Sequence, residues 1–200
     1  RVMRNTLTIN FYQLIFGFPV PLIFAILLNE LYSPKFKKGV QTVSYLPYFI
    51  SWVVAASIVI SVLSPENGML NNLRHMLFGA EPVYYLIKEN YFQPIIIISA
   101  IWKGFGMDAV YYLAALTSID QGLYEAAQID GAGKFRQIWH ITLPGVRSIA
   151  IVLLVLQIGS ITTIGFEQIF LLYNPTVYSV GDVISTYTYR LGVKQVQYSL

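Results

Sequence analysis

The sequence predicts an all-α membrane protein, a polytopic bundle of helices. Hydrophobic residues make up 56% of the 200 residues and charged residues only 12%, and the mean hydropathy is +0.58. A soluble domain carries about twice that charged fraction, so the apolar excess is expected to face lipid. The apolar stretches are long and lack the alternation of barrel strands, and lipid admits only helices or closed barrels.

The first predicted span runs from Asn5 to Asn29, a stretch free of charge. Its length suits a tilted helix that crosses the bilayer. Gly17, Pro19 and Pro21 lie inside it and would break a helix in water. In a bundle, neighbouring helices and waters satisfy the carbonyls that proline frees, so the stretch is still predicted to span.

Three further apolar stretches are predicted to span the membrane: Gly39 to Pro65, Tyr91 to Leu116 and Ile141 to Phe166. Pro144 stands in the first turn of the last one, where proline is tolerated. Beyond it, Asp182 is predicted to cap a helix that runs past the end of the chain. The expectation is four complete spans and part of a fifth, with both ends of the chain cut from a longer protein.

Three polar segments separate these spans, and the first is Glu30 to Lys38. Residues 66–90 contain Asn67-Gly68 and Gly79 as turn signals, and their short apolar runs predict small surface helices. Residues 118–140 are polar and amphipathic. Basic residues are nearly balanced between the two sides of the predicted bundle, so the positive-inside rule leaves the orientation open.

Several classes of function are disfavoured. The net charge of +3, with no long basic run, does not indicate a nucleic-acid surface. The chain has no cysteine, and His75 and His140 have no companions at ligand spacing, so no metal site is predicted. No Ser/His/Asp set or carboxylate pair indicates a catalytic centre.

The most specific pattern is the segment EAAQIDGAGKFRQIWHITLP, residues 125–144. Gln121 to Ile129 is predicted to form a short helix rich in small residues. Gly131-Ala132-Gly133 permits a tight turn with positive φ, and Lys134 to His140 is predicted to form a second short helix before Pro144. Small residues let such a hairpin seat closely in a groove of another protein.

This segment resembles the EAA loop of binding-protein-dependent ABC importer permeases of the MetI-like type. The resemblance implies that residues 118–144 are a cytoplasmic coupling loop that docks into a separate ATPase subunit, and that residues 66–90 are extracytoplasmic. The alternative is an ordinary surface hairpin between two spans. The residues that carry the pattern, and that the resemblance assigns to coupling, are Glu125, Ala126, Ala127, Asp130, Gly131, Ala132, Ile141, Leu143 and Pro144.

The resemblance extends over nearly the whole chain and is greatest to the sugar-importer branch, including permeases of the LplB type. It implies a multi-pass protein of the cell membrane that carries a sugar or oligosaccharide. The implied partners are a second homologous permease, a pair of ATPase subunits and an extracytoplasmic solute-binding protein. Two alternatives stay open: another cargo, such as a glycerol phosphate, an amino acid or a peptide, and a membrane enzyme or passive channel that shares only the bundle.

Gly131-Ala132-Gly133-Lys134 looks like part of a phosphate-binding loop. A Walker A sequence ending there needs glycine at 128 and serine or threonine at 135, where this chain has Gln128 and Phe135. No nucleotide or other cofactor is therefore expected on this chain, and ATP with Mg²⁺ is expected on the partner ATPase.

A substrate pathway is predicted along the third span. Lys103 and Asp108 are ionisable residues within it, and such residues by default suggest a pathway. The alternative is that Lys103 snorkels and Asp108 faces a neighbouring helix. Aromatic faces suit sugar rings but also form interfacial belts. The aromatic candidates are Trp102, Tyr111 and Tyr112.

Overall fold

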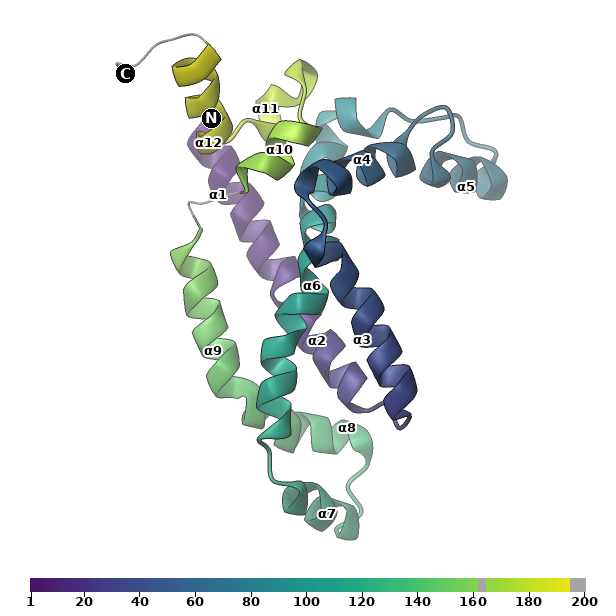
Figure 1. Cartoon of the computed structure of the whole chain (residues 1–200), viewed down its shortest axis with the longest axis vertical. Helices are drawn as coiled ribbons and strands as arrows, with labels where there is room; N and C mark the ends of the chain where they lie inside the picture. Colours follow the sequence, from purple (N-terminus) through teal and green to yellow (C-terminus); the bar gives the residue numbers. More distant parts are fainter. Residues whose placement is uncertain (162–164, 195–200) are drawn as a thin grey trace.

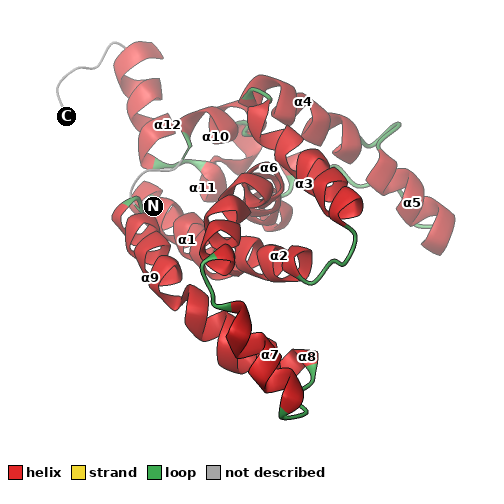
Figure 2. Cartoon of the chain, turned by 60° about the horizontal axis from the view of Figure 1, so that its bottom comes forward, coloured by secondary structure: helices red, strands yellow, loops and turns green. Residues whose placement is uncertain are grey.

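The computed structural model describes residues 1–161 and 165–194, and these residues form helices and loops without a β-strand (Figure 2). The helices longer than one turn are α1 (Val2–Tyr12), α2 (Pro19–Asn29), α3 (Pro34–Phe49), α4 (Trp52–Leu63), α5 (Met69–Phe78), α6 (Glu89–Thr117), α7 (Gln121–Ile129), α8 (Lys134–Gln137), α9 (Leu143–Gly159), α10 (Phe166–Leu172), α11 (Tyr178–Gly181) and α12 (Ile184–Tyr189). Short 3₁₀ turns occupy Tyr85–Ile87 and Pro175–Val177, and π turns occupy Gln13–Gly17, Ile138–Thr142 and Arg190–Lys194.

In Figure 1, α1 with α2 and later α6 run toward the end that holds α7 and α8, while α3 and later α9 run back from it. In chain order, α1 with α2, α3, α6 and α9 are called the first, second, third and fourth crossings. Among the residues that the structure describes, three helices are long and apolar enough to cross a membrane, Val2–Asn29, Glu89–Thr117 and Lys134–Gly159. The pair α3 and α4 makes a fourth if it is counted as one span. The all-α membrane fold is therefore confirmed, and the predicted count of four spans holds on that reading.

The first span is continuous despite its prolines. A π turn, Gln13–Gly17, ends two residues before Pro19, and a second π turn, Ile138–Thr142, ends two residues before Pro144. Proline has no N–H to donate and its ring crowds the preceding turn, so a widened turn lets the helix continue past it.

The predicted second span, Gly39 to Pro65, is wrong as a single helix. The stretch divides into α3 and α4, whose axes are bent by 104° at the break. Ser51 begins α4 as its N-cap, and its hydroxyl accepts a hydrogen bond from Val54 N–H at 3.3 Å. A serine that satisfies the first free amides of a helix allows it to begin in the middle of an apolar run.

The predicted fourth span, Ile141 to Phe166, is shifted. The helix starts at Lys134, so the expected separate short helix at Lys134 to His140 is continuous with the span, and it ends at Gly159. Phe166 begins α10 instead. Residues 162–164 lie outside the described part of the chain.

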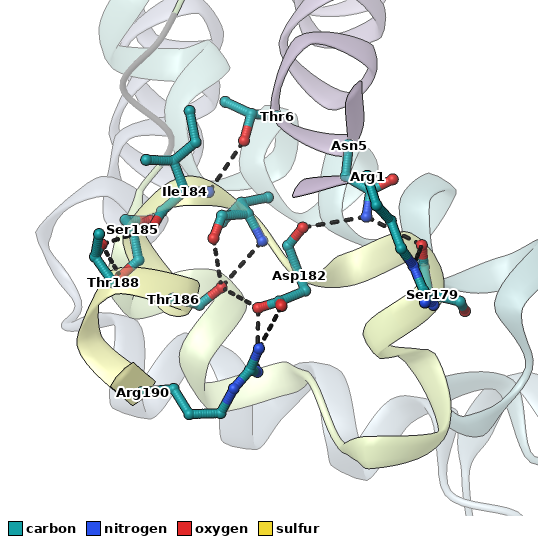
Figure 3. Close-up of polar contacts among 11 residues, drawn as sticks. Arg1, Asn5, Thr6, Ser179, Asp182, Ile184, Ser185, Thr186, Thr188 and Arg190 are labelled. Atoms are coloured by element: carbon teal, nitrogen blue, oxygen red, sulfur yellow. Dashed lines mark hydrogen bonds and ion pairs between the residues drawn. The ribbon is translucent and has the colours of Figure 1, made fainter. Parts of the chain in front are cut away.

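The prediction that Asp182 is the N-cap of a helix is off by one residue. Val183 is the N-cap of α12, and Asp182 precedes it (Figure 3). The Asp182 carboxylate accepts a hydrogen bond from Thr186 Oγ1 at 3.0 Å and pairs with Arg190 at 2.5 Å. This helix and the π turn after it stand where a fifth span was expected to begin, and residues 195–200 lie outside the described part.

Side-chain amides fasten the α10–α12 end to the long helices. Asn5 Nδ2 donates to the carbonyl oxygens of Ser179 and Asp182, at 3.1 Å each (Figure 3). Gln168 Nε2 donates to Ile96 O at 2.6 Å. Because buried carbonyls of short helices and loops need a donor, these amides make the irregular end stable in the bundle.

Helix α6 lies at the centre of the bundle and contacts α2, α3 and α9 (Figure 2). Two buried apolar clusters pack against its two ends. One includes Phe92, Ile96 and Ile169, and the other includes Ala109, Tyr112 and Leu116. The middle of α6, residues 97–108, lies between these clusters.

The contact between α3 and α6 depends on a glycine. Gly106 is buried, and a Cβ added there would overlap the backbone carbonyl of Ser44. Small residues permit helices to approach this closely in a membrane bundle, where tight packing replaces the hydrophobic driving force.

We expect Gly106→Ala to destabilise the protein by about 1–3 kcal/mol, because one helix must move away from the other. Gly39→Ala in α3 is the matched control, since a Cβ there meets nothing within 4 Å. The control is expected to be neutral or slightly stabilising, because alanine favours a helix over glycine. Thermal unfolding in detergent measures both, and equal melting temperatures for the two variants would contradict the close contact.

Candidate functional site

The hairpin at residues 118–144 is built by capping. Asp120 Oδ1 accepts a hydrogen bond from Gly122 N–H at 2.9 Å and begins α7. At its other end, Ala132 N–H donates to Ala127 O at 2.8 Å and Gly131 N–H donates to Gln128 O at 3.0 Å. Gly131 has φ +73°. These paired bonds with a left-handed glycine form a Schellman motif, so α7 ends in a fixed reversal.

Two further contacts close the hairpin. Gln137 is buried, and its Nε2 donates to Ala132 O at 2.9 Å. The Tyr124 hydroxyl lies 3.0 Å from Thr142 Oγ1, which joins α7 to the π turn below α9. The hairpin is therefore braced internally and can move as one unit.

An ion pair connects the hairpin to the first span. Lys134 Nζ lies 2.8 Å from Glu30 Oε2 at the end of α2. The Lys134 side chain is 56% exposed, so the pair contributes at most about 1 kcal/mol to stability. Its effect is to set the position of the hairpin relative to the loop between the first two crossings.

The hairpin exposes large apolar side chains. Ile129 is 87% exposed and Phe135 is 79% exposed, and Leu123 and Trp139 are also exposed. Exposed apolar groups gathered on a polar loop indicate a surface for another protein. Glu125 is exposed too, and it makes no hydrogen bond or ion pair with the residues that the structure describes.

The remaining residues of the pattern lie around this surface. Ala126 is exposed on α7, Asp130 is exposed directly after it, and Pro144 is exposed at the start of α9. Ile141 and Leu143 are half-buried where the hairpin joins the fourth crossing.

Two adjoining hollows, of about 380 and 320 Å³, lie beside the middle of α6. Both are lined by Gln13 from the first crossing, Ala100 from α6, and Gln157 and Ser160 from the end of α9. Three of these four shared residues are polar, which is costly in a span and is typical of a pathway.

Three of the predicted pathway residues line the larger hollow. Asp108 and Tyr111 are exposed, and Tyr112 is buried with its ring edge against Phe18. Asp108 has no hydrogen bond or ion pair among the described residues. Its carboxylate is therefore available to accept hydrogen bonds in the hollow.

Lys103 lines the smaller hollow. Its Nζ donates to Tyr48 O at 2.8 Å and lies 5.5 and 5.4 Å from the ring centroids of Tyr48 and Trp52. These two aromatic residues flank the break between α3 and α4.

Trp102 lies apart from the other four predicted residues, in an apolar hollow with Val62, Pro94 and Ile98. Gln13 and Gln157 line both polar hollows but were not predicted as pathway residues. The sequence signal that could have identified them is an amide side chain within an otherwise apolar span.

The arrangement suits binding and passage of a polar solute. Aromatic faces, amides, one cation and one carboxylate supply contacts for hydroxyl-rich molecules. Within residues 1–161 and 165–194, no group of three or more His, Asp or Glu side chains could hold a metal ion.

The family model described as "Binding-protein-dependent transport system inner membrane component" matches residues 10–193. The chain is 44% identical over 198 residues to the polygalacturonan/rhamnogalacturonan transport system permease protein YteP of Bacillus subtilis, covering 99% of this chain and 61% of that protein. It is 45% identical over 199 residues to Protein LplB of the same organism, covering 100% of this chain and 62% of that protein.

Among solved structures, the chain is similar to one in the crystal structure of a bacterial alginate ABC transporter in complex with an alginate pentasaccharide-bound periplasmic protein. The TM-score is 0.94 at 48% identity, over 99% of this chain and 68% of that one. The chain thus spans 61–62% of the length of the two curated relatives.

Gly131→Ala is expected to loosen the hairpin, because an L-residue in the left-handed region costs about 1–2 kcal/mol. Gly133→Ala is the matched control: Gly133 has φ −67°, and a Cβ there meets nothing within 4 Å. Hydrogen–deuterium exchange of residues 121–137 in the purified protein is expected to speed up in the first variant alone. Identical exchange in both variants would contradict the role of the left-handed turn.

Proposed function

The chain belongs to the family of binding-protein-dependent transport system inner membrane components, and from this premise we propose that it is the transmembrane subunit of an ATP-driven ABC importer. The observation that carries the proposal is the braced hairpin, which combines a rigid reversal with exposed apolar side chains at one end of a membrane bundle. Its cargo is a sugar or oligosaccharide, as in the polygalacturonan/rhamnogalacturonan permease YteP and the alginate transporter, after whose cargo those proteins are named.

The hairpin at residues 118–144 docks into an ATPase subunit on the cytoplasmic side. Ile129 and Phe135 enter a groove of that subunit, and Glu125 makes a charged contact with it. ATP and Mg²⁺ bind to a pair of such ATPase subunits, while this chain does no catalysis.

The hairpin is joined directly to two walls of the hollow. It follows α6, which contributes Asp108 and Tyr111, and it runs on into α9, which contributes Gln157. When the ATPases close, a hairpin that moves as one unit would shift α6 and α9 against the first crossing. The hollow would thereby open alternately to the two sides, driven by the free energy of ATP binding.

Two further partners complete the proposed importer. A second homologous permease supplies the other half of the pathway. An extracytoplasmic solute-binding protein delivers the cargo to the opposite end of the bundle, where residues 66–90 and the α10–α12 segment lie (Figure 1).

Phe135→Asp is expected to weaken association with the ATPase at least about tenfold, because a charge would enter an apolar groove. The fold should survive, since the side chain is 79% exposed. Met76→Asp is the matched control: Met76 is 84% exposed on α5, at the other end of the bundle. Co-purification with the ATPase measures both. Undiminished association of the Phe135 variant would contradict docking through the hairpin.

Tyr111→Ala is expected to lower uptake at limiting substrate about fivefold, through loss of about 1 kcal/mol of stacking or hydrogen bonding in the hollow. Tyr111 is 52% exposed and Tyr12, on α1, is 40% exposed, so Tyr12→Ala is the control outside both polar hollows. Radiolabelled uptake into cells measures both. The pathway role of Tyr111 fails if its variant transports as well as the control.

A further inference from the structure

Lys103 is a cation in the middle of a membrane-spanning helix without a counter-charge. The two ion pairs of the described residues are Glu30 with Lys134 and Asp182 with Arg190, and neither involves Lys103. An ionised group at membrane depth is costly, and such groups normally pair with an opposite charge or face a wet pathway. Lys103 faces a hollow, so its missing partner can come from there.

The protein holds the ammonium group in place without neutralising it. The carbonyl of Tyr48, in the last turn of α3, accepts one hydrogen bond from Nζ at 2.8 Å. The end of a helix leaves carbonyls free and favours a cation, which explains why Lys103 rests there. An ammonium group has three donors, so two remain for a ligand.

The walls of this hollow suit a sugar ring. Tyr48 and Trp52 place their rings beside Nζ, with centroids 5.5 and 5.4 Å away. Amide side chains complete the lining, namely Asn10, Gln13, Gln157 and Gln168. No acidic residue lines this hollow among the described residues, so nothing there repels an anion.

We propose that Lys103, with Tyr48 and Trp52 as flat walls, is the subsite for the carboxylate of an acidic saccharide. The proposal rests on the proposed function and narrows its cargo from sugars in general to sugar acids. A carboxylate carries one negative charge, which neutralises the single positive charge of the Lys103 ammonium group. A phosphate ester carries nearly two negative charges and would leave one unpaired beside Lys103.

Asp108 gives the bound chain a direction. It lies five positions after Lys103 on α6, about 7.5 Å further along the axis, and lines the adjoining hollow. Its carboxylate repels acidic groups and accepts hydrogen bonds from hydroxyls. A sugar acid would therefore be held with its carboxylate toward Lys103 and its hydroxyl-rich edge toward Asp108.

A structural role for Lys103 makes a different prediction. If Lys103 only fastens α6 to the end of α3, its loss would impair passage of every cargo equally. If it binds a carboxylate, its loss would act on acidic cargo selectively. The informative quantity is therefore the ratio of acidic to neutral uptake.

The test uses the complete importer in proteoliposomes, with trimers of galacturonate and of alginate as probes, each beside its carboxyl-reduced form. We expect the unchanged protein to prefer the acidic forms and Lys103→Gln to lower the acidic-to-neutral ratio about tenfold, the effect of losing a hydrogen bond to a charged group. Lys103→Arg keeps the charge and should keep the preference. Lys38→Gln removes an exposed cation of α3 outside both hollows and should leave the ratio unaltered.

An unchanged ratio in Lys103→Gln, or an equal loss of both uptakes, would overturn the carboxylate subsite and leave sugar import standing. Preference of the unchanged protein for the neutral forms would overturn it as well. Uptake of neither form by the unchanged protein would contradict the proposed function itself, and the subsite with it.

Discussion

Every feature of this molecule depends on one constraint: backbone groups in hydrocarbon must find their partners within the protein. Within an uninterrupted helix the backbone groups bond to one another. Where a helix ends or bends, a side chain or a special turn supplies the missing hydrogen bonds. Ser51 caps the helix after the break in the second crossing, Asn5 binds carbonyls of the C-terminal segment, and Lys103 binds the end of α3. Both candidate sites lie next to such irregular points, the hairpin at the reversal after α7 and the smaller hollow at the break between α3 and α4.

The hairpin and the polar hollows are connected by continuous helices, so a movement of the hairpin would be transmitted to the hollows. The hairpin begins where α6 ends and is continuous with the helix that contains α9, and both helices line the polar hollows. A Schellman reversal at Gly131 and the Gln137 amide make the hairpin stiff, so a push at its surface reaches α6 and α9 without being absorbed by the loop. The glycine of the pattern thus has a direct physical role in the turn, through its left-handed backbone conformation.

The sequence predicts those helix ends that depend on residues next to them in the chain. The helix Gln121–Ile129 has its predicted bounds, because Asp120 begins it and Gly131 ends it. The break at Ser51 escapes prediction, since the surrounding run is uniformly apolar and the two helices joined by the 104° bend pack on different partners, α3 on α6 and α4 on α10. The two hollows cannot be predicted either, because residues from all four crossings, far apart in the chain, must come together before these cavities exist.

Side-specific labelling tests the coupling role most directly, and the absence of native cysteine makes a single introduced thiol a clean probe. In stripped inside-out vesicles, an impermeant maleimide should label Gln128→Cys, and added ATPase should protect it. In right-side-out vesicles, the reagent should label Asn72→Cys and leave Gln128→Cys unmodified. Labelling of Gln128→Cys in right-side-out vesicles, or no protection by the ATPase, would contradict the account.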